Sequence, residues 1–165
     1  MKVITGLPDK MGYTVEETLE AEDGEIYTIA YKEKTGNIEK NKTKKALVIN
    51  TRKTTSLKLT KKVDSPLEED TKAKYCFFLK LKNDDEVLNG TYGGYRFSSG
   101  EAMIWVAGGS SVKIDQIPLG TTYKIREAVE EGAFEVTING EKGTSAKGKI
   151  ASDGSSEIIV TINVY

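Results

Sequence analysis

The strongest constraint on the fold of this chain is an internal repeat. An Ile-x-x-x-Pro segment at residues 4–8 is followed by a Tyr-x-Val-x-Glu segment at residues 13–17, and both recur, with Ile for Val, at residues 114–118 and 123–127. Only three residues precede the first copy, whereas the second follows strand-like sequence that reaches back to Leu57. We therefore expect two copies of one structural unit, with the front of the first copy missing.

The local pattern in both copies is that of β-strands. Apolar and polar residues alternate at residues 57–60, 75–81 and 123–126, which is the period of a half-buried strand. Gly-Gly, Asn-Gly and Asp-Gly pairs separate these runs as turns do in all-β domains. No segment has an apolar stripe of helical period over a dozen residues. The pattern predicts an all-β sandwich with little helix.

The repeat also predicts the domain organisation. Residues 1–52 correspond to the last strands of an incomplete first repeat, and residues 53–165 to a complete domain of immunoglobulin-like size, with residues 52–56 as the linker. A sheet without its early strands exposes an apolar face and free edges, so we expect partial disorder of residues 1–52, strand exchange through them with a neighbouring molecule, or both. The alternative is that these strands pack on the second domain as additional sheet.

Composition excludes several classes of function. The chain has no histidine and one cysteine, so it cannot build a Ser-His-Asp or Cys-His pair, a disulfide framework or a zinc cluster, and we expect no cofactor and no metal. Its 24 basic and 25 acidic residues leave no excess positive charge for nucleic acid or anionic lipid. The sequence contains neither a signal peptide nor an apolar run of membrane-spanning length, so we expect no direct membrane contact.

Three polar residues of the complete copy are candidates for a site. Lys61 shares the alternation phase of Leu57 and Leu59, and Glu127 shares the phase of Ile125, so both are predicted to point into the core. For Asn163, in the last strand, the pattern does not decide, because residues 158, 160, 162 and 164 make the opposite phase equally apolar.

A buried lysine, glutamate and asparagine can react with one another. Desolvation favours the neutral amine and the neutral acid, so the amine becomes a nucleophile and the acid a proton donor. Attack of the amine on the Asn163 carboxamide, with Glu127 polarising the carbonyl and carrying the proton to the leaving group, releases ammonia and leaves a Lys-Asn isopeptide bond. The alternative is an unreacted Lys61–Glu127 salt bridge in the core.

The sequence resembles the isopeptide-forming pilin and adhesin-stalk domains of Gram-positive surface proteins, the CnaB-like and major-pilin backbone modules. The resemblance rests on residues 57–63, the Asn-Gly-Thr-Tyr-Gly-Gly segment at 89–94, the turn at 97–100, the Ile-Pro-Leu-Gly-x-x-Tyr-x-Ile-x-Glu segment at 117–127 and the closing Asn-Val-Tyr. It implies a CnaB-type Greek-key β-sandwich with Lys61 as the amine, Glu127 as the catalytic acid and Asn163 as the acceptor.

In the first copy, Glu17 and Asn50 match the acid and acceptor positions, and no residue matches the lysine. We interpret this copy as a vestigial form of the site.

The resemblance further implies a function and a location. We expect a structural stalk or pilus-shaft module, extracellular and attached to the cell wall in its parent protein, with no turnover of a substrate. Its partners would be neighbouring stalk domains of the same protein, with any host surface ligand bound through other domains. The alternative is a ligand-binding adhesin module that recognises host matrix or carbohydrate through its loops.

Several other features receive simpler interpretations. The basic segment at residues 40–45 and the acidic clusters at 68–70 and 84–86 are predicted to be solvated turns. Cys76 and Trp105 fall opposite the apolar phase of their strands, and so does Met103. An outward tryptophan can mark a contact with a partner.

Overall fold

A computed structural model describes residues 1–129, 132 and 134–165 of the chain. It divides the chain into two compact units, Met1–Lys53 and Thr54–Tyr165. The expected linker at residues 52–56 is wrong in extent, because strand β4 ends at Arg52 and strand β5 begins at Thr54. The β-branched pair Thr54 and Thr55 instead extends β5, where the two residues pair with Pro118 and Ile117.

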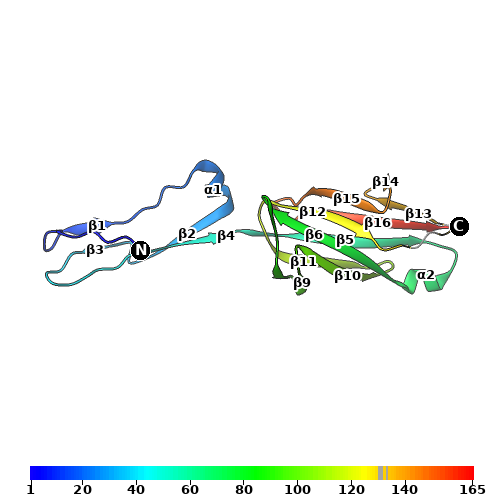
Figure 1. Cartoon of the computed structure of the whole chain (residues 1–165), viewed down its shortest axis with the longest axis horizontal. Coiled ribbons are helices and arrows are strands. Elements are labelled where there is room, and N and C mark those ends of the chain that lie inside the picture. Colours follow the sequence, from blue (N-terminus) through cyan, green and yellow to red (C-terminus); the bar gives the residue numbers. More distant parts are fainter. Residues whose placement is uncertain (130–131, 133) are drawn as a thin grey trace. The chain divides into compact units, whose positions relative to one another are not determined.

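Unit 1 consists of short, sparsely packed elements (Figure 1). Its elements are β1 Gly12–Thr14, α1 Ala21–Ile26, β2 Tyr27–Lys32, β3 Thr35–Asn37 and β4 Leu47–Arg52. Strand β1 pairs with β3, and β2 pairs antiparallel with β4, so both sheets have two strands. Every residue of unit 1 is described, and each is half-buried or exposed. Unit 1 therefore has no closed core of its own.

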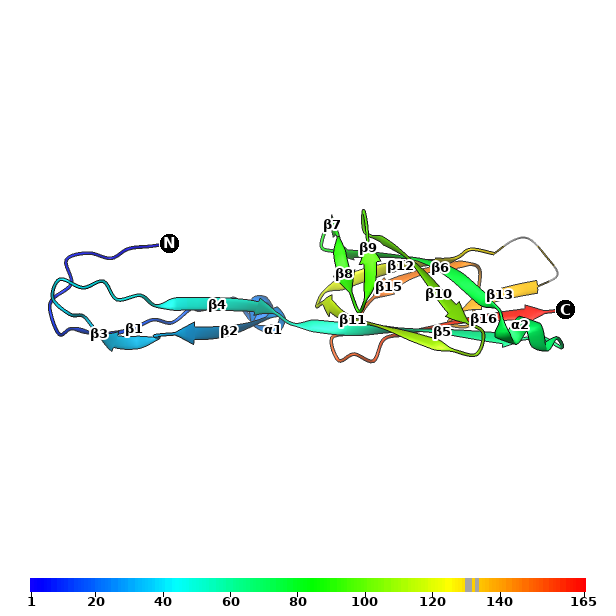
Figure 2. The same cartoon turned by 90° about the horizontal axis from the view of Figure 1, so that it is seen from below.

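Unit 2 is a sandwich of two five-stranded sheets (Figures 1 and 2). The first sheet contains β6 Lys74–Asn83, β7 Glu86–Val87, β10 Glu101–Ala107, β12 Thr121–Glu127 and β15 Ser145–Lys149, in the order β10-β6-β12-β15 with β7 on β6. The second contains β5 Thr54–Asp64, β11 Ser111–Pro118, β13 Phe134–Ile138, β14 Glu141–Lys142 and β16 Glu157–Val164, in the order β11-β5-β16-β13-β14. A hairpin of β8 Gly90–Tyr92 and β9 Tyr95–Phe97 and the short helix α2 Glu68–Lys72 complete the unit.

The inward phase of the strands fills the space between the two sheets. Strand β5 contributes Leu57 and Leu59, β6 contributes Phe77 and Leu79, and further apolar side chains come from β10, β12 and β16. These strands alternate between buried and solvent-facing residues, as the sequence predicts. The structure confirms the predicted all-β, immunoglobulin-like sandwich, with helix confined to two short segments of the described chain.

The first and last strands of unit 2 lie side by side. Strand β16 pairs parallel with β5, so that Val160 is opposite Lys61 and Asn163 is opposite Asp64. A parallel pair cannot be joined by a tight turn, and here almost the whole unit connects the two strands. The two ends of the domain therefore meet in the middle of one sheet.

Candidate functional site

Lys61 is the most unusual residue of the core. Its side chain is 0% exposed, and it lies on β5 in the same inward phase as Leu57 and Leu59. The backbone is fixed at this point, because Lys61 N–H donates to the carbonyl of Ser110 and Gly109 N–H donates to the carbonyl of Lys61, each at 2.9 Å. The strand therefore holds the ammonium group inside the sandwich, as the alternation predicts.

Glu127 meets Lys61 from the opposite sheet. It ends strand β12, is 4% exposed, and is held by a hydrogen bond from its N–H to the carbonyl of Thr144 at 2.8 Å. Lys61 Nζ donates to Glu127 Oε1 at 2.5 Å, and the side chains of both residues are fully buried. The two inward predictions are confirmed, and the pair links the two sheets through the core.

The surroundings of this pair are largely apolar. Lys61 Nζ lies 4.4 Å from the centre of the Tyr75 ring and 5.8 Å from that of Phe77. Burial lowers the pKa of Lys61, against the opposing effect of the Glu127 carboxylate, and burial likewise raises the pKa of Glu127, against the effect of the Lys61 ammonium. Both shifts favour a neutral amine beside a neutral acid.

One oxygen of this site remains open. Glu127 Oε2 is buried and has no hydrogen-bond partner among the described residues. A buried carboxyl oxygen without a hydrogen bond lowers the stability of the fold, so a third polar group beside Glu127 Oε2 would stabilise the site.

Asn163 does not reach the pair in this register. The buried residues of β16 are Ile158, Val160 and Ile162, and Asn163 belongs to the other phase, where it is half-buried. Its neighbours across the sheet are Asp64 on β5 and Glu135 on β13. No hydrogen bond within the described part of the chain joins it to Lys61 or Glu127.

The corresponding residues of unit 1 do come together. Asn50 Nδ2 donates to Glu17 Oε1 at 3.0 Å, and Glu17 Oε2 is buried without a partner among the described residues. Each unit thus contains, within itself, two of the three groups that an isopeptide site needs. The glutamate of unit 2 holds an amine and has a free oxygen, whereas the glutamate of unit 1 holds a carboxamide and has a free oxygen.

The two asparagines occupy different phases of their strands relative to the strand they pair with. Asn50 is opposite Ile29, on the half-buried phase of β2, whereas the buried residue of β13, Val136, is opposite Ile162. Residues 47–51 match residues 160–164 in sequence, which aligns Asn50 with Asn163. In β16, however, Ile162 and not Asn163 lies on the buried phase. A shift of one residue turns a side chain to the other face of a sheet.

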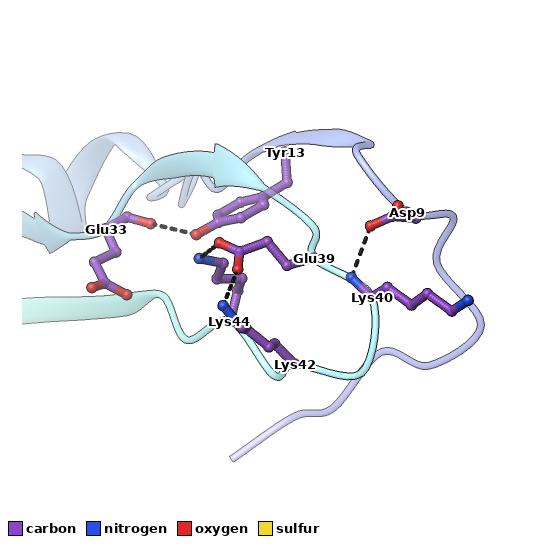
Figure 3. Close-up of polar contacts among 7 residues, drawn as sticks. All are labelled: Asp9, Tyr13, Glu33, Glu39, Lys40, Lys42 and Lys44. Atoms are coloured by element: carbon purple, nitrogen blue, oxygen red, sulfur yellow. Dashed lines mark hydrogen bonds and ion pairs between the residues drawn. The ribbon is translucent and has the colours of Figure 1, made fainter.

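The remaining sequence features lie outside the core. In the basic segment of unit 1, Lys42 Nζ lies 2.5 Å from Glu39 Oε2 and Lys44 contacts Glu39 Oε1, so one acid pairs with two lysines (Figure 3). Nearby, Lys40 N–H donates to Asp9 Oδ1 at 2.8 Å (Figure 3). Glu39 therefore offsets one of the four lysine charges of this segment, which is the exposed loop between β3 and β4 and not a hairpin, because these two strands belong to different sheets.

Two further features differ from simple turns or surface residues. The acidic cluster at 68–70 forms the start of α2 rather than a turn, with Asp70 accepting from the hydroxyl of Ser65. Cys76 faces away from the core as predicted, opposite Trp105, yet it is buried. Burial raises the pKa of its thiol, against the effect of the Arg126 charge.

The described residues contain neither a metal-binding cluster nor a membrane-spanning helix. They contain no group of three or more His, Cys, Asp or Glu side chains placed to hold a metal ion. Their helices are too short and too polar for any of them to span a bilayer.

The chain resembles several solved structures of surface proteins. The pilus-presented adhesin Spy0125 (Cpa) matches with a TM-score of 0.59 and 24% identity over 69% of this chain and 28% of that chain. The major pilin T-13 from Streptococcus pyogenes matches with a TM-score of 0.48 and 20% identity over 79% and 52%. A Mobiluncus mulieris adhesin containing disulfide, isopeptide and ester cross-links gives 0.43 and 22% over 71% and 43%.

The likeness to the pilus-presented adhesin shows that this chain shares the β-sandwich fold of part of that protein, which defines its class as a pilin-type β-sandwich. The chain spans about a quarter of that adhesin's length. Within this class the family is also defined, because residues 55–165 match the model described as "Domain of unknown function (DUF7601)", and the chain belongs to that family. The comparison with curated proteins found no match.

Proposed function

We propose that this chain is a structural stalk or pilus-shaft module of a bacterial cell-surface adhesin, extracellular and attached to the cell wall in its parent protein. The observation that carries the proposal is the buried Lys61–Glu127 pair, which joins the two sheets of a pilin-type sandwich. The side chains of this amine and acid are 0% exposed in the described part of the chain, so the pair is placed to reinforce the domain and not to receive a substrate from solvent. The partners of such a module are neighbouring stalk domains of the same protein.

In its full form, the proposal includes an autocatalytic isopeptide bond between Lys61 and Asn163. The neutral Lys61 Nζ attacks the side-chain carbonyl carbon of Asn163, while the protonated Glu127 carboxyl donates a hydrogen bond to the carbonyl oxygen. Glu127 then carries the proton that Lys61 Nζ loses to the departing amide nitrogen. One amide bond forms, one breaks, and ammonia leaves. The free Glu127 Oε2 is the position at which the carboxamide would bind, as Asn50 binds to Glu17 in unit 1.

This reaction requires Asn163 to turn inward. Asn163 is the second-last residue of β16, where a β-bulge of one residue would re-aim its side chain without moving the apolar residues 158, 160 and 162. The observed register favours a second candidate, in which Lys61 and Glu127 remain an unreacted ion pair and the strand stays regular.

Intact mass spectrometry separates these two forms. The crosslinked protein weighs one ammonia less than its sequence, and Lys61→Ala, Glu127→Ala or Asn163→Ala restores the full mass. Lys62→Ala is the matched control, because Lys62 is the outward neighbour on the same strand and its loss leaves the deficit unchanged. If well-folded protein has the full mass of its sequence, Lys61 and Glu127 form an unreacted ion pair and the crosslink is absent.

We also propose that residues 1–52 are the final strands of an incomplete stalk repeat, completed by a strand from another molecule. Unit 1 has no buried residue, and β4 pairs only with β2, whereas its counterpart β16 is flanked by β13 and β5. In this proposal Glu17 and Asn50 keep the geometry of the site in the absence of an amine.

A further inference from the structure

The outer face of the β10-β6-β12-β15 sheet carries a cluster of cations. Six basic side chains point away from the core where β6, β12 and β15 lie side by side, two from each strand, and we call this cluster the basic face: Lys80, Lys82, Lys124, Arg126, Lys147 and Lys149. A third outward lysine of β6, Lys74, lies at the start of that strand and outside the cluster. All six are half-buried or exposed. They make up a quarter of the 24 basic residues in a chain whose net charge is −1. The charge of this face is therefore far from the average of the chain.

The register places like charges directly beside one another. Lys80 is opposite Lys124, and Lys124 is opposite Lys147, so three lysines form one row across three neighbouring strands. Adjacent strands are about 4.8 Å apart, and like charges directly opposite destabilise a sheet. None of the six residues of the basic face forms a salt bridge within the described chain. Glu101 on β10 is opposite Lys80 at one end of this row, whereas the cross-strand partners of Lys124 and Lys147 within the row are lysines. The repulsion between Lys124 and its two neighbours therefore has a cost in stability.

The second sheet of the same unit is built differently. On its outer face Lys58 Nζ lies 3.5 Å from Glu157, which is opposite Lys58 on β16, and Lys142 Nζ lies 2.6 Å from Glu135 on β13. Lys113 on β11 is also opposite Lys58, but Lys113 Nζ lies 3.1 Å from Asp115, so each of these three lysines has an acid within salt-bridge distance. None of the six cations of the basic face has one among the described residues, and this contrast supports a role of that face in binding.

An apolar border runs along one side of the basic face. Met103 and Trp105, on β10, are 56% and 55% exposed and point outward from the same sheet. Phe78 is opposite Met103, and the Arg126 guanidinium stacks 3.8 Å from the Phe78 ring. A shallow hollow in this face is lined by side chains from both the basic and the apolar parts: Phe78, Lys80, Glu101, Lys124, Arg126 and Lys147. The surface thus combines fixed cations with exposed aromatic area.

We propose that this face binds a linear sulfated polysaccharide. Sulfate groups are permanently anionic, and a chain that carries them at intervals matches rows of cations spaced about 5 Å across the strands and about 7 Å along them. The sugar rings offer apolar C–H faces that stack on an exposed indole. Trp105 would therefore contribute stacking on a sugar ring in addition to the attraction between the cations and the sulfate groups. This site lies on a sheet face and is independent of the buried Lys61–Glu127 pair.

Titration calorimetry with a size-defined heparin octasaccharide tests the proposal. Lys80→Gln/Lys124→Gln/Lys147→Gln should weaken binding by about tenfold or more, because it removes the central row of cations. The matched control, Lys58→Gln/Lys62→Gln/Lys113→Gln, removes the same charge from outward positions of the other sheet and should change the affinity by less than about twofold. Trp105→Ala should weaken binding of the octasaccharide but not of inorganic polyphosphate.

The melting temperature of each variant distinguishes a loss of binding from a loss of folding. Because the row of lysines repels itself, the Lys80/Lys124/Lys147 variant should melt at the same or a higher temperature than the parent while it loses binding. The proposal is overturned if the parent does not bind the octasaccharide at low salt, or if the control triple variant loses as much affinity. It is also overturned if single-stranded DNA or the desulfated octasaccharide binds equally well.

Discussion

At the scale of single residues, the buried pair makes the sharpest prediction about stability. We expect Lys61→Met alone to destabilise unit 2 by about 3–5 kcal/mol, since it leaves the Glu127 carboxyl buried without its partner. The double variant Lys61→Met/Glu127→Leu should lose much less, because both charges are then replaced by apolar groups. Urea denaturation in an Asn163→Ala background measures this coupling without any crosslink.

Two results would contradict this account of the core. One is a loss below about 1 kcal/mol for Lys61→Met, which would mean that water reaches the pair. The other is equal losses in the single and double variants, which would mean that the two side chains act independently.

Cys76 gives a second prediction at this scale. Its thiol is buried and its pKa is raised, so the reactive thiolate is scarce at pH 8 in the folded protein. Alkylation by iodoacetamide should therefore be slower in the native chain than in urea and should accelerate as the pH rises. Trp105→Ala, which removes the side chain opposite Cys76, should speed the reaction. Equal native and denatured rates would show that the thiol is open to solvent.

At the scale of elements, alternation predicted the strands whose two faces differ in polarity. In β5 and β12 the outward residues are polar or charged, so the inward position of Lys61 and Glu127 follows from the sequence. In β16 both phases are apolar, and alternation cannot choose between them. The choice comes from pairing with β5 and β13, which is a property of the tertiary fold and not of the strand itself.

The basic face could not be recognised from sequence for a related reason. Its six cations come from three strands that are separated in the sequence. The sequence of each strand alone predicts only that one side of that strand faces solvent. Only the register brings Lys80, Lys124 and Lys147 into one row. The outward position of Trp105, by contrast, was predicted, since β10 alternates clearly.

The sheets of unit 1 lead to a prediction about exchange. Strands β2 and β4 pair only with each other and bury no side chain, so their amides should exchange with solvent much faster than those of β5 and β16. Hydrogen exchange with mass detection measures both sets in one sample. Adding a synthetic peptide with the sequence of Thr54–Asp64 should slow exchange in β4 if its free edge accepts a strand.

The control peptide carries alanine in place of Leu57 and Leu59, which removes the apolar phase that a sheet would bury. Protection of β4 equal to that of β16 in a monomer without added peptide would contradict the proposal that unit 1 is incomplete.

At the scale of the whole molecule, the adjacency of first and last strands determines how unit 2 transmits force. Tension that enters through β5 and leaves through β16 acts on two neighbouring parallel strands, which separate by shearing their hydrogen bonds. An isopeptide bond between Lys61 and Asn163 would carry that load covalently and leave the sandwich between them unstretched. It would also stabilise the domain by about 4–5 kcal/mol, by analogy with a disulfide that closes a loop of about 100 residues.

Single-molecule extension distinguishes the two forms of the core directly. From residue 61 to residue 163 the chain covers 102 residues, which release about 340 Å when an uncrosslinked domain unfolds under load. We expect the parent protein to show no such step, because the bond excludes this segment from the loaded path, and Asn163→Ala to show it in every trace. Lys62→Ala, with its crosslink intact, should behave as the parent does. A step of about 340 Å in the parent would place the strength of the domain in its hydrogen bonds and in the Lys61–Glu127 ion pair.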